Sequence, residues 1–287
     1  MINAPEISVV SPCYNHGEFI EDMLSSVLAQ TFQGFEVIIV NDGSNDSTRK
    51  KLDTICHPKV KILHCSHNGP SFARNAGIEE AKGKIVLNLD ADDKIAPTYL
   101  EKAYEIFFSN PEIGIVASEV EYFGAKSGKF HLDSFSLKGM LKDNLISSTA
   151  LFKKSDWEKA GGYSIDFPFG IEDYDFWLSI LELGKEVYKI PETMAYYRKY
   201  SDYVKCRSER RKCSRKKSTL ARLMLFHRHQ KLFARVPEEY QKMMLLNEKW
   251  ENESFLEREI KEVYHYARYR LRSTRLYKFL QEIFIRN

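Results

Sequence analysis

The sequence predicts an α/β protein built on a mixed, mostly parallel β-sheet that is flanked by helices. Four short apolar runs rich in Val and Ile recur within the first hundred residues, and helix-like segments separate them. Apolar residues fill successive positions of these runs, which indicates strands that are buried on both faces. Strands of this kind that alternate with helices are typical of parallel βαβ units.

The elements of the first hundred residues follow in a regular order. The predicted strands are EISVVS (6–11), FEVIIV (35–40), KVKILH (59–64) and KIVLNL (84–89). The predicted helices between them lie near 17–30, 46–55 and 71–82.

From about residue 112 the pattern changes to shorter strands around one clear helix. Strands are expected at GIVASEVEYF, STALF and KEVYKI, and the helix over 172–183 follows a turn at Gly161-Gly162. Strand signals end after residue 203, and we expect 205–235 and 238–284 to be helical. The fold therefore carries a C-terminal helical extension.

Composition narrows the class of protein. With 287 residues, 43% of them hydrophobic, the chain can bury a large core, which excludes a disordered or fibrous protein. No apolar stretch approaches the ~18 residues of a membrane span, and Met1–Glu6 does not resemble the start of a signal peptide. The five cysteines are scattered without a CxxC pair, which favours reduced thiols over disulfides or a zinc site. We expect a cytoplasmic protein.

Polar clusters follow each of the first four predicted strands. They are SPCYN, NDGSNDST, HNGPSFARNAG and LDADD, in that order. In open parallel sheets, ligands bind beyond the carboxyl ends of the strands. These clusters are therefore the first candidates for a binding site.

The first three clusters each have a structural and a functional interpretation. Pro12, Tyr14 and Asn15 form either a simple turn or a surface that can stack on a flat ring and hydrogen-bond to it. Asp42 ends a strand before a helix-capping sequence, where it could accept hydrogen bonds from a base or a ribose. Arg74 is either a solvated helix side chain or a bidentate donor to a diphosphate, although its surroundings match neither the Walker pattern nor GxGxxG.

The run IVLNLDADDKIAP places Asp90, Asp92 and Asp93 within four positions at the end of a strand. Neighbouring carboxylates repel one another and raise each other's pKa unless a cation or hydrogen-bond donors compensate the charge. A polar turn before a helix that begins near Pro97 is the structural alternative. A bound divalent cation is the functional one.

The helix GIEDYDFWLSIL opens with acidic residues and continues with an apolar stripe. Acids in a first helical turn are favoured by the helix dipole, which is a structural explanation for Glu172 and Asp173. In the functional interpretation, Asp173 is a general base. The buried stripe is expected to comprise Phe176, Trp177, Ile180 and Leu181.

In order and spacing, SPCYN, NDGS, NxGxxxARNxG, LDADD, the GGY turn and the ED helix resemble the inverting nucleotide-sugar glycosyltransferases of family 2, which have the GT-A fold. The resemblance covers about residues 5–200. It implies a metal-dependent transfer of a sugar from a nucleotide sugar, with UDP as the expected nucleotide, to a glycan or lipid-linked glycan. Bacterial surface polysaccharide or glycolipid synthesis is the expected setting.

The resemblance also implies roles for particular residues. The nucleotide-binding residues would be Pro12, Tyr14, Asn15, Asp42, Arg74 and Asp90. Asp92 would bind Mn²⁺ or Mg²⁺, Asp173 would be the catalytic base, and Glu172 and Trp177 would lie on the acceptor side. Asp93 is expected to have a structural role.

One position departs from the family pattern. Many relatives carry a histidine three residues after the tyrosine of a YR pair, where it can assist at the metal. In this sequence the segment is YYRKYS, and Tyr200 stands where that histidine would be. The identity of a second protein ligand for the metal is therefore open.

The resemblance divides the chain into a catalytic domain at 1–202, with a nucleotide-binding half (1–118) and an acceptor half (119–202), and an extension at 203–287. The segment 203–235 has twelve Lys and Arg residues against one acid, Glu209. It is either a helix packed on the catalytic domain, a contact with an anionic membrane surface on the inner face of the cell membrane, or a protein-binding surface. Without a recognition fold, nucleic-acid binding is not expected.

Two features leave further alternatives open. Residues 248–262 are rich in Glu and 268–286 are rich in Arg, which is compatible with a homodimer contact.

Two other functions compete with a glycosyltransferase: an inactive scaffold that binds nucleotide sugars, and a nucleotidyltransferase. The retained ED and LDADD carboxylates argue against the first, and the lack of a lysine-bearing, glycine-rich loop near the first strand argues against the second.

Overall fold

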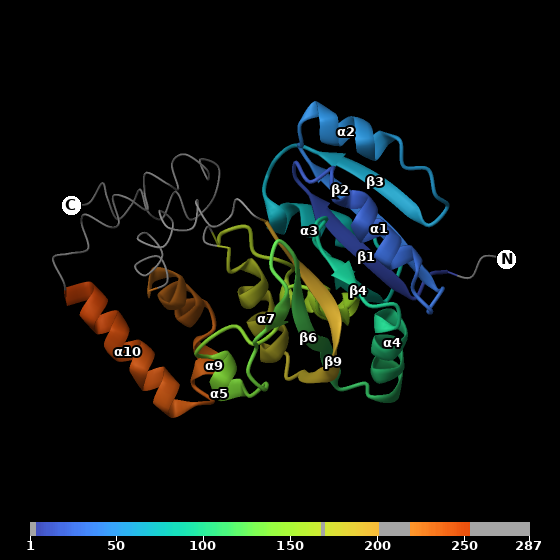
Figure 1. Ribbon diagram of the computed structural model, residues 1–287. Coiled ribbons are helices and arrows are strands. Elements are labelled where there is room, and N and C mark those ends of the chain that lie inside the picture. Colours follow the sequence, from blue (N-terminus) through green and yellow to red (C-terminus); the bar gives the residue numbers. More distant parts are fainter. Residues whose placement is uncertain (1–3, 168–169, 201–218, 253–287) are drawn as a thin grey trace.

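The computed structural model describes residues 4–167, 170–200 and 219–252. Its centre is one mixed sheet in the strand order β3-β2-β1-β4-β8-β6-β9-β5, with β7 added beside β6. Helices pack against both faces of this sheet (Figure 1). The predicted α/β class is confirmed.

The first half of the sheet is parallel, as predicted. Its elements are β1 (Ile7–Cys13), α1 (Ile20–Leu28), β2 (Phe35–Asp42), α2 (Asp46–Asp53), β3 (Val60–Cys65), α3 (Pro70–Glu79) and β4 (Ile85–Asn88). β1 pairs with both β2 and β4, and β2 pairs with β3, all in parallel register. All four predicted strands and all three predicted helices are therefore present.

Burial on two faces explains the continuous apolar runs. Along β2, Val37 and Ile39 belong to one hydrophobic cluster, while Ile38 and Val40 belong to the other, because successive side chains point to opposite faces. β3 differs from the prediction of a fully buried strand. It is the edge strand of the sheet, and it exposes Lys61 and His64.

The second half of the sheet mixes strand directions. Its elements are β5 (Lys94–Ile95), α4 (Tyr99–Ser109), β6 (Ile113–Gly124), β7 (Gly128–Phe130), α5 (Leu137–Met140), β8 (Leu151–Lys153), α6 (Lys154–Ala160), α7 (Glu172–Glu182) and β9 (Glu186–Lys199). β8 is antiparallel to β4 and β6, whereas β9 is parallel to β6. Because β6 crosses residue 118, the two predicted halves share one sheet, and the division at 118/119 stays a prediction.

Helix α7 is the most deeply packed helix near the predicted site. Phe176 and Trp177 are fully buried, and both pack against Phe152 of β8. The expected buried stripe is thus present. The expectation that Trp177 lies on the acceptor side is wrong, because a fully buried indole within the core cannot reach an acceptor.

The described part of the C-terminal extension is helical but not one continuous helix. Residues 219–228 form a helix, which is followed by α9 (Gln230–Phe233) and α10 (Pro237–Asn252). The helix expected over 205–235 is interrupted at His229, whose buried Nε2 lies 2.9 Å from Oδ1 of Asp175 on α7. Arg228 Nε lies at the same distance from that oxygen. This cluster anchors the described part of the extension on α7.

The apolar side chains of this segment face the protein. Leu223, Phe226, Leu232 and Phe233 are buried in the same cluster as α7. For residues 219–235 this favours a helix packed on the catalytic domain over an amphipathic membrane helix. Residues 203–218, which hold most of the basic charge, and the expected dimer contact beyond 252 lie outside the described residues.

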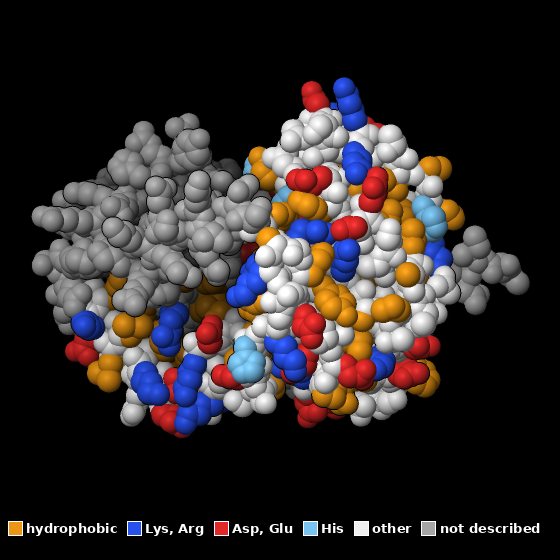
Figure 2. Space-filling view, in the orientation of Figure 1, with side chains coloured by type: hydrophobic (Ala, Val, Ile, Leu, Met, Phe, Trp, Pro, Cys, Tyr) orange, Lys and Arg blue, Asp and Glu red, His pale blue; other side chains and the backbone are white. Residues whose placement is uncertain are grey.

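The outer surface of the extension mixes both signs of charge. Figure 2 shows Lys, Arg, Asp and Glu side chains intermingled over α5 and α10. Lys138 Nζ lies 2.8 Å from Glu238 Oε2, and Lys142 Nζ lies 3.7 Å from Glu239 Oε1. Of the helices that the structure describes, none is long and apolar enough to cross a membrane.

Candidate active site

The loops after β1 and β2 hold each other in place at the carboxyl edge of the sheet. Asn15 has a positive φ of 59°, a conformation that Asn tolerates better than most residues. Its Oδ1 accepts from Asn45 N at 2.7 Å, and its own N donates to Ser44 Oγ at 3.0 Å. Asn45 also caps α2 by accepting from Thr48 N, as the sequence predicted. In the structure Asn15 therefore organises the loop, and direct nucleotide contact by its side chain stays a prediction.

The predicted base-binding residues lie around one stacked pair of rings. Tyr14 is 46% exposed and stacks on His67, with ring centroids 4.0 Å apart and planes inclined by 17°. Buried Asp42 accepts from His67 Nδ1 at 2.9 Å and from the backbone N of Asn68 and Gly69 at 2.8 and 3.0 Å. These bonds hold the turn that begins α3. Pro12 lies in β1 and is half-buried.

Arg74 links the two acidic motifs. Its Nη2 donates to Asp90 Oδ1 at 3.0 Å, and its Nη1 donates to Glu172 Oε1 at 2.8 Å. The side chain is almost fully buried. Burial alone would lower the pKa of the guanidinium, but the carboxylates of Asp90 and Glu172 outweigh it and raise that pKa. Arg74 therefore stays charged, and it joins the LDADD turn to the ED helix.

Asp173 stands beside this bridge at the start of α7. Its Oδ1 accepts from Tyr174 N at 2.8 Å, and its Oδ2 accepts from Asn144 Nδ2 at 3.3 Å. Burial, and next the negative charge of Glu172, raise the pKa of Asp173 to about 7. A carboxylate with a pKa near neutrality is suited to accept a proton from a hydroxyl.

Asp92 and Asp93 follow Asp90 in the turn after β4, but they face different partners. Asp92 Oδ2 accepts a short hydrogen bond from the Tyr200 hydroxyl, and Asp92 Oδ1 lies 3.6 Å from His16 Nδ1. Burial, and next the charge of Asp90, raise the pKa of Asp92. Asp93 is buried and accepts from the backbone N of Arg198 in β9 at 2.9 Å. Asp93 therefore has the expected structural role, since it ties the turn to β9.

The donor set at Asp92 suits a divalent cation that shares its ligands with a substrate. In the part of the chain that the structure describes, no group of three or more His, Cys, Asp or Glu side chains forms a complete metal site. Oxygen ligands are those that Mg²⁺ and Mn²⁺ prefer, and Mg²⁺ is commonly held by one or two carboxylates plus substrate phosphates. Asp92 fits that arrangement.

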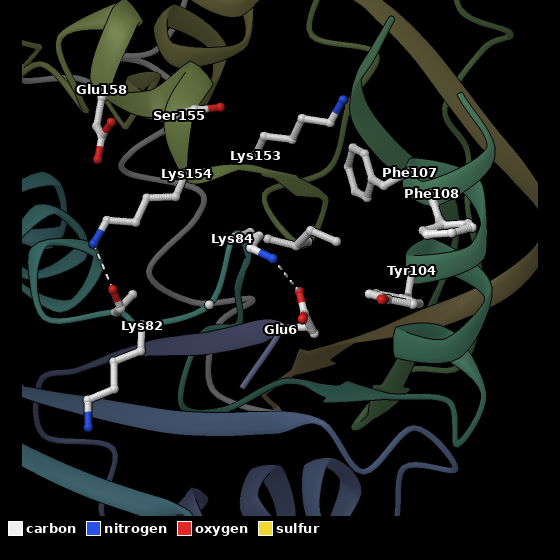
Figure 3. A pocket seen from close by; sticks show the side chains of 13 residues that line it. Glu6, Lys82, Lys84, Tyr104, Phe107, Phe108, Lys153, Lys154, Ser155 and Glu158 are labelled. Atoms are coloured by element: carbon white, nitrogen blue, oxygen red, sulfur yellow. Dashed lines mark hydrogen bonds and ion pairs between the residues drawn. The ribbon is translucent and has the colours of Figure 1, made fainter. Parts of the chain in front are cut away.

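A cavity lies elsewhere, near the amino ends of β1 and β4. It has a volume of about 800 Å³ and lies between α4 and the β8–α6 connection. Figure 3 shows Tyr104, Phe107 and Phe108 along one side, with Lys153 reaching toward Phe107 and Lys82, Lys84 and Lys154 lying farther from these rings. None of the predicted site residues lines it. Its lysines lie near the amino ends of β1 and β4, whereas the Asp90–Arg74–Glu172 bridge lies near the carboxyl ends of these strands.

Sequence reasoning missed two residues of the site. His16 was part of the SPCYNHGEF stretch, but nothing local marked it as a partner of Asp92. Asn144 lies in a loop without any recognisable motif. Tyr200 was identified as a departure from the family pattern, and the structure supplies its contact with Asp92.

Similar solved structures define the class of this fold. The chain superposes on S. aureus TarS 1-349 in complex with UDP with a TM-score of 0.56 at 19% identity, covering 69% of this chain and 61% of that one. It also matches the mannosyltransferase PcManGT from Pyrobaculum calidifontis, in complex with GDP-Man and Mn²⁺, with a TM-score of 0.59 at 18% identity, covering 99% of this chain and 87% of that one. The fold is that of the GT-A glycosyltransferases, as predicted.

Sequence similarity then identifies the family. Residues 8–168 match the family described as Glycosyl transferase family 2. The chain is 32% identical over 205 residues to TuaG of Bacillus subtilis, described as a putative teichuronic acid biosynthesis glycosyltransferase, and the match covers 68% of this chain and 79% of TuaG. The chain therefore belongs to glycosyl transferase family 2, which confirms the resemblance seen in the sequence.

Proposed function

We propose that this protein is a metal-dependent, inverting glycosyltransferase that moves a sugar from a nucleotide sugar to a hydroxyl group. The observation that carries this proposal is the Asp90–Arg74–Glu172 bridge, because it brings together the LDADD turn and the ED helix, which lie far apart in the sequence. The donor is expected to be a UDP-sugar, since TarS structures carry UDP and UDP-GlcNAc, although PcManGT carries GDP-Man. The acceptor is a glycan or lipid-linked glycan of bacterial surface polysaccharide synthesis, a proposal supported by the relative TuaG, which is named for teichuronic acid biosynthesis.

The reaction is a single displacement in which Asp173 is the base. Asp173 accepts the proton of the acceptor hydroxyl, whose oxygen forms a bond to the anomeric carbon. The bond from that carbon to the diphosphate oxygen breaks on the opposite face, and its electron pair leaves with the nucleoside diphosphate. The configuration at the anomeric carbon is therefore inverted. Asn144 holds the carboxylate of Asp173 in place through its side-chain amide.

The nucleotide side of the site consists of charged and aromatic groups. Asp92 would hold Mn²⁺ or Mg²⁺. When bound, such an ion would neutralise the negative charge that develops on the leaving diphosphate. Tyr14, which is 46% exposed, would stack on the base. Arg74 is paired with both Asp90 and Glu172, and its guanidinium would lie beside the diphosphate of the donor.

The direct test is to screen a panel of nucleotide sugars by thermal shift, with and without Mn²⁺, and then to determine the anomeric configuration of the product by NMR. We expect metal-dependent stabilisation by one nucleotide class and an inverted product. Binding of a nucleotide sugar without transfer or hydrolysis would instead support a scaffold without catalytic activity.

The pH dependence of transfer should report the ionisation of Asp173. Since burial raises its pKa to about 7, the active, deprotonated form is the minor one below that pH and the major one above it. The kcat/KM of the free enzyme should therefore rise about tenfold per pH unit on the acid side and level off near pH 7 to 8. Initial rates at saturating metal concentration measure this profile. A rate that is constant between about pH 5.5 and about pH 8 would contradict the assignment of Asp173 as the base.

We also propose that the protein acts in the cytoplasm, at the inner face of the cell membrane, through the basic residues of 203–218. Each basic residue near an anionic surface contributes about 1 kcal/mol of binding energy. We expect the full chain to sediment with vesicles that contain anionic phospholipid, and to be released by salt. Failure to bind such vesicles at low salt would eliminate the membrane contact without affecting the proposed chemistry.

A further inference from the structure

The position of His16 is held on both sides by the fold. His16 follows Asn15, whose backbone is in the left-handed region, and precedes Gly17, whose N donates to Thr48 Oγ1 at 3.3 Å. A Cβ at Gly17 would lie only 2.9 Å from Thr48 Cα, so the turn is pressed against α2. His16 O accepts from Phe19 N at 3.0 Å. The imidazole is therefore presented from a well-defined turn at the carboxyl end of β1.

The imidazole faces the outer oxygen of Asp92. His16 Nδ1 lies 3.6 Å from Asp92 Oδ1, and the two side chains are 40% and 15% exposed. The other oxygen, Asp92 Oδ2, is already occupied by the Tyr200 hydroxyl. The rings of Phe19 and Tyr200 lie 6.1 and 6.4 Å from the His16 ring. One carboxylate oxygen and one ring nitrogen are thus left facing each other in an accessible position.

This separation is too long for a hydrogen bond and close to that of two ligands on one ion. Hydrogen bonds to nitrogen are about 2.7–3.2 Å long. Two neighbouring ligands of an octahedral ion with bonds of ~2.1 Å lie about 3 Å apart. A shift of about half an ångström, within the rotamer freedom of a half-exposed histidine, would allow both atoms to bind one cation.

Tyr200 cannot fill this position itself. Its hydroxyl donates a hydrogen bond to Asp92 Oδ2, the oxygen that does not face His16. This bond orients the carboxylate and leaves Oδ1 toward His16. Tyr200 is thus a positioning residue for Asp92.

We propose that His16 Nδ1 and Asp92 Oδ1 are the two protein ligands of the divalent ion, with His16 replacing the histidine that the family pattern places at the position of Tyr200. The inference rests on the proposed function, since it concerns the same ion. Imidazole nitrogen is a softer ligand than carboxylate or water, so it favours Mn²⁺ over Mg²⁺. His16 therefore sets a preference for manganese.

Manganese binding tests this directly, without any measurement of activity. Mn²⁺ is titrated into the full-length protein with saturating UDP, and free Mn²⁺ is followed by EPR. We expect His16→Gln to weaken Mn²⁺ binding about tenfold or more, since even the loss of an outer-shell partner costs about 10–100-fold. Mg²⁺ binding, measured by competition, should change less. His131→Gln, the same substitution at an exposed histidine, should bind both ions like the wild type.

Two further measurements separate ligation from a structural role. Pulsed EPR of the wild-type Mn²⁺ complex should show ¹⁴N coupling from a bound imidazole, and His16→Gln should lose it. His16→Asp should retain metal binding and shift the preference toward Mg²⁺. Unchanged Mn²⁺ affinity in His16→Gln, or a wild-type complex without ¹⁴N coupling, would overturn the inference. Failure of the wild type to bind Mn²⁺ with any nucleotide would instead refute the metal dependence in the proposed function.

Discussion

Replacing Asp173 with Asn is expected to lower the turnover of sugar transfer by about 10²–10⁴-fold, the usual contribution of a general base. The carboxamide keeps the shape of the side chain, and its oxygen can still accept from either Asn144 Nδ2 or Tyr174 N, but it cannot accept the acceptor proton. Donor binding should be nearly unchanged, because Asp173 faces Glu172 and Arg74 rather than the loops after β1 and β2. Single-turnover transfer and donor affinity, measured on the same preparation, give both quantities.

The thermal stability of the same variant separates loss of a base from loss of the fold. The pKa of Asp173 rises from an ordinary value of 3.8 to about 7 on folding. Its carboxyl therefore binds a proton more strongly in the folded than in the unfolded state, and the folded state loses stability as the pH rises between these two values. Asn removes this cost. The Tm of the Asn variant should exceed that of the wild type, and by more at about pH 8 than at about pH 5.

A matched control and a contrary outcome complete this test. Asp133→Asn removes the same charge at an exposed position and should leave both turnover and Tm unchanged. If purified Asp173→Asn had wild-type turnover, the assignment of the base would be wrong.

Replacing Asp92 with Ala should lower turnover by about 10²-fold or more, because charge neutralisation by a metal contributes several kcal/mol and each 1.36 kcal/mol is tenfold in rate. The remaining activity should no longer respond to added Mn²⁺ or to a chelator. Turnover as a function of metal concentration, for wild type and variant, measures this effect.

Asp92→Asn serves as the control for the packing around this residue. Its amide oxygen can still accept from the Tyr200 hydroxyl, so the turn after β4 should keep its geometry, while the negative charge at the metal is lost. The Asn variant should therefore resemble the Ala variant in activity and have a Tm at least equal to that of the wild type, because the raised pKa of Asp92 costs stability when the carboxyl is ionised. Transfer that is insensitive both to the Ala substitution and to chelation would remove Asp92 from the metal site.

Much of the fold was predictable from local pattern. β1, β2 and β4 are buried on both faces, so their sequences are mostly apolar. Such strands can be recognised in the sequence even when their order in the sheet is unknown. The N-cap of α2 was predictable because Asn45 and Thr48 interact within one turn. By contrast, the break at His229 depends on Asp175, 54 residues away, and no local signal reveals it.

The class of the protein, the strands and helices of the first half, and the acidic motifs at the carboxyl ends of the strands follow from local sequence patterns alone. These features depend on residues within a few positions of one another, and hydrophobic periodicity, capping and motif spacing record them directly. Which side chains meet, by contrast, became known from the folded structure. Tyr200 reaches Asp92 across 108 residues, Arg74 reaches Glu172 across 98, and Trp177 proves to be a core residue. The reason is physical: the energies of burial and charge pairing depend on neighbours that the folded sheet brings together, and the order of the sequence does not record them.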